Sequence, residues 1–181
     1  MRMYIRLLHI ILVALSRKSD LPYDGESVLH FTVMPWDCVV QFMGNDRYHA
    51  FMDLGRVDLL MRLGAWEPII RGRLQPFVAN VHIRHRHRLA MLRRFTLRTR
   101  LIHADNRFYL MEHIFQSGEQ IIATAISRNG LTRNGKIAPT DGILHSFGYK
   151  RKTRGDETMG ALRSVEKLLR GIRIKPHNHK W

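Results

Sequence analysis

The stretch that decides the fold is NDRYHAFMDLGRVDLLMRLG, residues 45–64. Its apolar residues recur at steps of three and four, which places them on one face of an α-helix. The set that repeats in this way is Ala50, Leu54, Val57 and Met61, with Phe51 and Leu60 beside it. The pattern predicts one long helix, from Asp46 to Leu63, that buries this face.

The polar residues of the same stretch mark its ends and its other side. Asn45 or Asp46 is a suitable N-cap, and Gly64 is a suitable C-terminal stop. The polar stripe of the helix carries His49, Asp53 and Arg56. Because Asp53 and Arg56 stand three residues apart, we expect an ordinary ion pair between them.

Segments rich in strand formers flank this helix. Residues 28–34 precede it and end before Pro35, which predicts a first strand. Four further strands are expected at 77–88, 94–103, 107–116 and 120–132, and the short links at 104–106 and 117–119 imply hairpins. One strand, a helix and four antiparallel strands bury both apolar faces only if the sheet wraps the helix, an α+β arrangement.

The third of these strands shows how its two faces differ. One face carries Phe95, Leu97, Thr99 and Leu101, and the other carries Arg94, Thr96, Arg98 and Arg100. This alternation predicts that one face of the sheet is buried and that the other meets water or a charged partner.

The two ends of the chain read as additions to this domain. Residues 1–20 contain an amphipathic helix with Arg2, Arg6, His9 and Ser16 on one side and Leu7, Leu8, Ile11, Leu12 and Leu15 on the other. It is too short to span a bilayer. A packing element, a contact with a membrane surface and a signal peptide all remain open. Residues 149–181 read as a basic linker, a short helix and a tail, which leaves 21–148 for the main domain.

Composition narrows the class of protein. The chain has 181 residues, of which 45% are hydrophobic, enough for one folded domain. A formal charge of +15 predicts attraction to anionic partners such as acidic lipids, phosphorylated cofactors or nucleic acid. No nucleic-acid module is recognisable, so no specific nucleic-acid partner is expected. The single cysteine, Cys38, favours a reducing compartment, and we predict a cytoplasmic protein, with a peripheral contact to a membrane as the open alternative.

The link between the first strand and the long helix carries the chemistry. It places a carboxylate, Asp37, just before a helix start whose amides favour developing negative charge. An acid beside such amides suits acyl transfer, with the carboxylate acting on water or on the carbonyl itself. A loop or capping aspartate is the competing interpretation for Asp37.

Three runs of residues resemble a known family. They are FTVMPWDC at 31–38, NDRY at 45–48 and FMDLGRVDLLMRLG at 51–64, with IRHR at 83–86 and FTLRTR at 95–100 in support. The chain resembles the hotdog acyl-CoA thioesterases of the 4-hydroxybenzoyl-CoA thioesterase-like group over residues 1–148. The resemblance implies a curved antiparallel sheet around a central helix, homodimers or dimers of dimers with sites at subunit interfaces, and hydrolysis of acyl-CoA without a further cofactor.

The resemblance also assigns residues, with departures. Asp37 matches the first acid of the motif Pro-x-Asp-x-Asp, but Val39 stands at the second acid, Phe42 or Met43 at the histidine, and Gly44-Asn45 at the paired asparagines. The catalytic candidates are Asp37, Asn45 and Tyr48. Three outcomes stay open: Asp37 takes the catalytic role, Asp53 takes it, or the protein binds acyl-CoA without cleaving it.

Candidates for binding the substrate complete the set. They are Asp46, Arg47, Asp53, Arg84 and Arg86, and the two arginines at 84 and 86 suit the phosphates of CoA. A solvated basic face is the alternative for Arg84, Arg86 and Arg88. His85 and His87 lack a nearby Cys, Asp or Glu to complete a tetrahedral set, so no metal is expected.

Overall fold

The protein is described by a computed structural model that covers residues 2–16, 21–22 and 24–140. The predicted tail at 149–181, and the end of the main domain beyond Thr140, lie outside the described residues. Among the described residues no helix is long and apolar enough to cross a membrane.

The elements follow one another in the predicted order, with five additions. They are α1 (Arg2–Ser16), β1 (Glu26–Thr32), a 3-10 turn η1 (Pro35–Asp37), β2 (Cys38–Val39), β3 (Phe42–Met43), α2 (Asn45–Arg62), α3 (Trp66–Arg71), β4 (Gln75–His85), β5 (Arg94–Ala104), β6 (Phe108–Ser117), β7 (Gln120–Arg133) and β8 (Lys136–Ala138). The sequence did not predict η1, β2, β3, α3 and β8, because elements of two to six residues carry no readable period.

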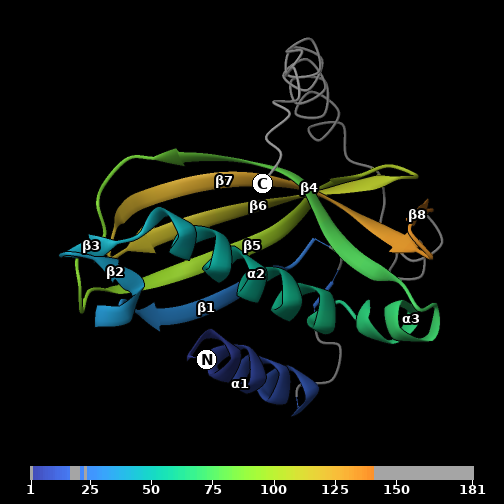
Figure 1. Ribbon diagram of the computed structural model, residues 1–181, viewed down its shortest axis with the longest axis horizontal. Coiled ribbons are helices and arrows are strands. Elements are labelled where there is room, and N and C mark those ends of the chain that lie inside the picture. The colour runs from blue at the N-terminus through green and yellow to red at the C-terminus, as the bar shows by residue number, and fades with distance from the viewer. Residues whose placement is uncertain (1, 17–20, 23, 141–181) are drawn as a thin grey trace, which may run out of the picture.

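The main sheet is antiparallel throughout, in the order β1-β5-β6-β7-β4, with β8 paired to β7. It curls around α2, which lies along its concave side, and α1 lies beside α2 next to β1 (Figure 1). The two short strands β2 and β3 form a separate hairpin at one end of the molecule, and α3 lies at the opposite end. The α+β, hotdog-type arrangement expected from the sequence is confirmed.

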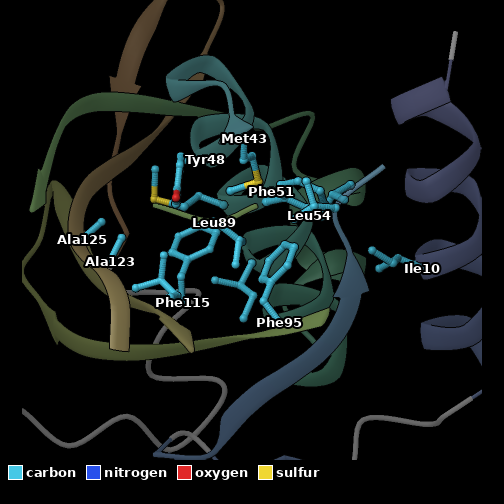
Figure 2. Packing of buried hydrophobic residues seen from close by; sticks show 14 residues of the cluster. Ile10, Met43, Tyr48, Phe51, Leu54, Leu89, Phe95, Phe115, Ala123 and Ala125 are labelled. Carbon is cyan, nitrogen blue, oxygen red and sulfur yellow. The ribbon is translucent and has the colours of Figure 1, made fainter. Parts of the chain in front are cut away.

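The helix α2 buries most of its length. Figure 2 shows Tyr48, Phe51 and Leu54 of α2 packed with Phe95 of β5 and Phe115 of β6. Phe51 meets Phe95 with ring centroids 5.0 Å apart, and Tyr48 meets Phe115 at the same distance. Edge-on aromatic pairs of this kind stabilise by about 1 kcal/mol beyond their buried area. The alternation predicted for residues 94–101 is confirmed, since the odd-numbered positions are buried.

One glycine allows the helix to approach the sheet. A Cβ at Gly55 would collide with the Thr99 hydroxyl and crowd Leu97, both on β5. The predicted stop at the other end of α2 also holds, because Gly64 adopts φ 74° just after the C-cap Leu63. The predicted N-cap was wrong: Gly44 occupies it, and Asn45 and Asp46 are the first residues of the helix.

The N-terminal helix forms, but it is rotated about its axis relative to the predicted orientation, so that only part of the predicted apolar side faces inward. Ile10 is buried in the core shared with α2, and Met3 and Leu7 pack against that core. Tyr4, Ile5, Leu8 and Leu12 are 57–74% exposed. Arg6 was predicted on the polar side of the helix. It points inward instead, because its guanidinium binds the buried carboxylate of Asp37.

Candidate active site

Asp37 lies at the end of η1 and is enclosed. Its carboxylate accepts two hydrogen bonds from the Arg6 guanidinium, at 3.0 and 2.9 Å, and a third from the Met34 amide at 3.0 Å. Its side chain has no exposed surface, whereas that of Arg6 keeps 19%. Both carboxylate oxygens are therefore occupied, and α1 is the element that occupies them.

The same arginine ties α1 to the aromatic core. The Arg6 guanidinium lies 5.0 Å from the Phe51 ring centroid, within the range of a cation–π contact. Beside it, burial and then the charge of Asp37 raise the pKa of the Cys38 thiol. The carbonyl of Asp37 accepts the Gly44 amide at 2.9 Å, which fixes the start of α2 against η1.

The positions that differ from the family motif carry no acid or base chemistry. Val39, where the second acid belongs, is 70% exposed at the end of β2. Phe42 lies under the guanidinium of Arg88, 5.3 Å from its ring centroid, and Met43 is buried. The loop between β1 and α2 is thus built from packing contacts and one ion pair.

The outward side of α2 gathers the exposed polar groups. Asn45, His49 and Asp53 succeed one another at four-residue steps, so they share one face, and all three are exposed. The Asp53 side chain keeps 65% of its surface exposed while it pairs with Arg56, as predicted. We call Asn45, His49 and Asp53 the α2 stripe. Arg56 was expected on this stripe, but it is largely buried, with only 10% of its side chain exposed.

The helix start beside the stripe is suited to negative charge. Gly44 caps α2 without a side-chain hydrogen bond, and the Asp46 carboxylate lies directly against Gly44 at this helix start. Asp46 is exposed at this end and forms an ion pair with Arg47 at 3.1 Å. Asn45, Asp46 and Arg47 therefore stand together around the positive end of the helix dipole.

Tyr48 points the other way, into the core. It is 2% exposed and meets the His85 ring edge-on, with centroids 4.6 Å apart. Burial raises the pKa of its hydroxyl to about 12. The contact between the Tyr48 and His85 rings places the end of β4 against α2. Burial, followed by the charge of His49, lowers the pKa of His85.

The basic residues of β4 are split between two places. Arg84 lies on the outer face of the sheet, in a shallow hollow of about 340 Å³ that also involves His82, Glu112 and Thr124. The strand was expected to continue to Arg88, but it ends at His85, because Arg86 and His87 turn and donate their amides to the Ile122 carbonyl. Arg86 and Arg88 thus leave the strand face that Arg84 occupies.

A second polar cluster is sealed beneath α2 and was not anticipated. His113 of β6 bonds to Thr99 at 3.2 Å and to Ser127 at 2.9 Å, and Asn129 donates to Ser127 at 3.0 Å. Burial and the nearby charge of Arg56 lower the pKa of His113 to about 3. The signal was present in the alternation of β6, whose inward positions include 109, 111, 113 and 115.

Within the described residues, no cluster of three or more His, Cys, Asp or Glu side chains is arranged to hold a metal ion. A sequence profile of the thioesterase-like superfamily matches residues 33–147. This chain belongs to that superfamily. The match spans the enclosed Asp37, the α2 stripe and strands β4 to β8, while α1 and β1 precede it.

Solved structures agree with this membership at the level of the fold. A probable thioesterase from Escherichia coli, YbaW, aligns with TM-score 0.61 and 18% identity, over 66% of this chain and 94% of that one. A 1,4-dihydroxy-2-naphthoyl-CoA thioesterase from Synechocystis aligns with TM-score 0.59 and 12% identity, over 68% and 95%. The 4-hydroxybenzoyl-CoA thioesterase of a Pseudomonas species gives TM-score 0.56 and 10% identity, over 63% and 91%. No curated protein matches the sequence of this chain significantly.

Proposed function

We propose that the protein hydrolyses a thioester between CoA and an acyl group, and that Asp53 supplies the reacting carboxylate. The observation that carries this choice is the contrast between two acids. Asp37 is enclosed by α1, whereas Asp53 is an exposed carboxylate on the stripe that starts at the amide-lined end of α2. Membership of the thioesterase-like superfamily supports the reaction class.

The reaction follows from these positions. Asp53 takes a proton from a water molecule, and the resulting hydroxide adds to the thioester carbonyl carbon. Because Asp53 lies eight residues, or about 12 Å along the helix axis, from the start of α2, the tetrahedral oxyanion is stabilised by hydrogen-bond donors nearer to Asp53 than that helix start. Its collapse breaks the carbon–sulfur bond, and the CoA thiolate recovers the proton. In this scheme Tyr48 is a packing residue and Asp37 anchors α1.

Three arginines are assigned to the binding of CoA, although Arg84 lies on the outer face of the sheet and not beside the α2 stripe. Arg47 stands beside the helix start, while Arg84 and Arg86 flank the end of β4. Guanidinium groups bind phosphate oxygens through paired hydrogen bonds, which suits the phosphates of CoA. Because β4 is an edge strand with Val78 40% exposed, we also propose that two copies associate along it and enclose the substrate.

Release of CoA from a panel of acyl-CoAs, followed with a thiol reagent, tests the proposal. Asp53→Asn should lower kcat/KM by about 100-fold or more, the usual loss on removing a general base. Glu67→Gln is the matched control, since Glu67 is also a 67% exposed helical carboxylate paired with an arginine, but on α3 at the far end. It should leave kcat/KM unchanged.

The variant Asp37→Asn distinguishes the proposed role of Asp37 from that of Asp53. If Asp37 only anchors α1, its variant should lose activity in proportion to the unfolded fraction. A loss of turnover in fully folded Asp37→Asn, with Asp53→Asn still active, would show that the assignment is wrong.

Binding without hydrolysis is the second candidate function. It is favoured by the enclosure of Asp37 and by Val39 at the second acid position. Saturable binding of acyl-CoA in calorimetry, with no CoA released from any substrate in the panel, would establish it and exclude hydrolysis.

A further inference from the structure

The end of the molecule beyond the sheet is built from two turns that lie side by side. The β2–β3 hairpin at 38–43 is joined to the loop at 86–94 by hydrogen bonds from Met43 to the Leu89 carbonyl, at 2.8 Å, and from Met91 to the Gln41 carbonyl, at 2.9 Å. Phe42 and Ala90 form an isolated β-bridge between them. We call residues 38–43 and 86–94 the basic tip; it includes the end marked by β2 and β3 in Figure 1.

Each turn of the basic tip presents an apolar residue in left-handed backbone geometry. Val40 has φ 63° and is 87% exposed, and Leu92 has φ 61° and is 66% exposed. A β-branched residue at positive φ is a genuine outlier, and such strain costs roughly 1–3 kcal/mol. The turn between β7 and β8 instead uses Asn134 at φ 51°, the residue type that favours this geometry.

More apolar surface surrounds these two side chains. Val39 is 70% exposed, Met91 39%, and Trp36, which directly precedes Asp37, 41%. Turns at the end of a sheet are normally polar. Here Val40 and Leu92 combine a strained backbone with an exposed apolar side chain, which indicates a partner that accepts apolar side chains.

Cations surround the apolar side chains without matching acids. Arg86, Arg88, Arg93 and Arg94 are all exposed, and the two segments of the tip contain no Asp or Glu. Among the described residues none of these four arginines forms an ion pair, although Arg93 donates to the Ser117 hydroxyl at 3.2 Å.

The acids closest to the tip leave it cationic. Asp37 is enclosed by Arg6, Asp46 is paired with Arg47, and Glu119 lies in the turn between β6 and β7. One acid in a neighbouring turn does not offset four exposed guanidinium groups. The partner is therefore expected to carry negative charge as well as apolar surface.

We propose that the basic tip docks on an anionic lipid bilayer. Val40 and Leu92 enter the boundary between headgroups and acyl chains, and the arginines bind headgroup phosphates. A nucleic acid fits the charge but not the side chains, because valine and leucine offer bases no stacking surface. The proposal does not depend on thioester hydrolysis.

Flotation with vesicles of phosphatidylglycerol and phosphatidylcholine tests it. Val40→Asn combined with Leu92→Asn removes both apolar anchors and places a residue favoured at positive φ in each turn. We expect vesicle binding to weaken by at least ~10-fold, as the loss of two inserted side chains implies. The melting temperature should stay level or rise, so a folding defect cannot explain the loss.

Two further variants locate the contact. Ile70→Gln on α3, at the opposite end and 58% exposed, should bind vesicles like the unmodified protein. Leu8→Gln removes an exposed leucine from the outer face of α1. If Leu8→Gln abolishes binding while the tip variant binds normally, α1 makes the contact and the proposal fails.

The charge requirement gives a separate test. Arg88→Gln and Arg93→Gln should each weaken binding to anionic vesicles by about 5-fold at low salt, from roughly 1 kcal/mol per arginine near the surface. Equal binding to neutral vesicles, or binding to DNA but not to vesicles, would contradict the proposal. So would a tip variant that turns a dimer into a monomer in light scattering, because the tip would then be an interface between copies.

Discussion

The ion pair between Arg6 and Asp37 makes a quantitative prediction about stability. Replacing Arg6→Met keeps a side chain of similar length but removes two of the three hydrogen bonds to the carboxylate. A charge with no exposed surface is then left without its counter-ion, which costs roughly 3–5 kcal/mol. Because the Arg6 side chain retains 19% exposure, we expect about 3 kcal/mol, at the low end of that range.

Urea denaturation at fixed protein concentration measures this loss. The double variant Arg6→Met with Asp37→Asn removes the stranded charge, so it should be more stable than Arg6→Met alone, with a coupling energy of about 1.5 kcal/mol or more. Arg71→Met is the matched control, because its pair with Glu67 is exposed on both sides and should contribute below about 1 kcal/mol. Additive effects, or an Arg6→Met variant within about 1 kcal/mol of the unmodified protein, would refute the buried-pair account.

Three further predictions concern residues packed inside the protein, namely His113, Gly55 and Cys38. Since burial holds the pKa of His113 at about 3, the unfolded state takes up the proton first, so stability falls as the pH drops from about 7 towards 3, by about 2 kcal/mol at pH 5; His113→Gln should remove this slope in urea titrations at the two pH values. Gly55→Ala should destabilise by ~1–3 kcal/mol despite its better helix propensity, with partial recovery on adding Thr99→Ala. Because burial and then Asp37 raise the pKa of Cys38, alkylation at pH 8 should be slower in the folded protein than in urea.

The long helix and the main strands could be predicted because their signals are local. The period of residues 45–64 predicts the helix, and Gly64 marks its end. The buried side is only partly the predicted one, because Leu54 and Met61 are buried whereas Ala50 is half-buried. Short links such as 104–106 fix the hairpins, and with them the antiparallel order. Such features depend on residues within a few positions of one another, so one sequence suffices to find them.

The docked face of α1 could not be predicted for the opposite reason. Apolar residues surround most of that helix, so Ile10 and Leu7 on one side compete with Leu8 and Leu12 on another. The choice is made by Asp37, 31 positions from Arg6 in the chain. Arg56 presents the same difficulty, because its helical position resembles that of an exposed residue while β5 and β6 bury it.

The departures from the family motif and the position of α1 explain each other. An aspartate in this loop stays available only if nothing neutralises it, and Arg6 both neutralises and covers Asp37. Once the carboxylate serves as an anchor, a second acid at position 39 would add repulsion beside a buried charge, and valine there avoids that cost. The proposed reaction then uses a carboxylate outside the loop. Of the three acids of α2, Asp46 pairs with Arg47 at the helix start, Asp58 is buried against Ser27, and Asp53 lies on the exposed stripe. With Asp53 as the proposed reacting acid, folded Asp37→Asn should still hydrolyse thioesters but lose the docking of α1, whereas Asp53→Asn should keep α1 docked and lose turnover.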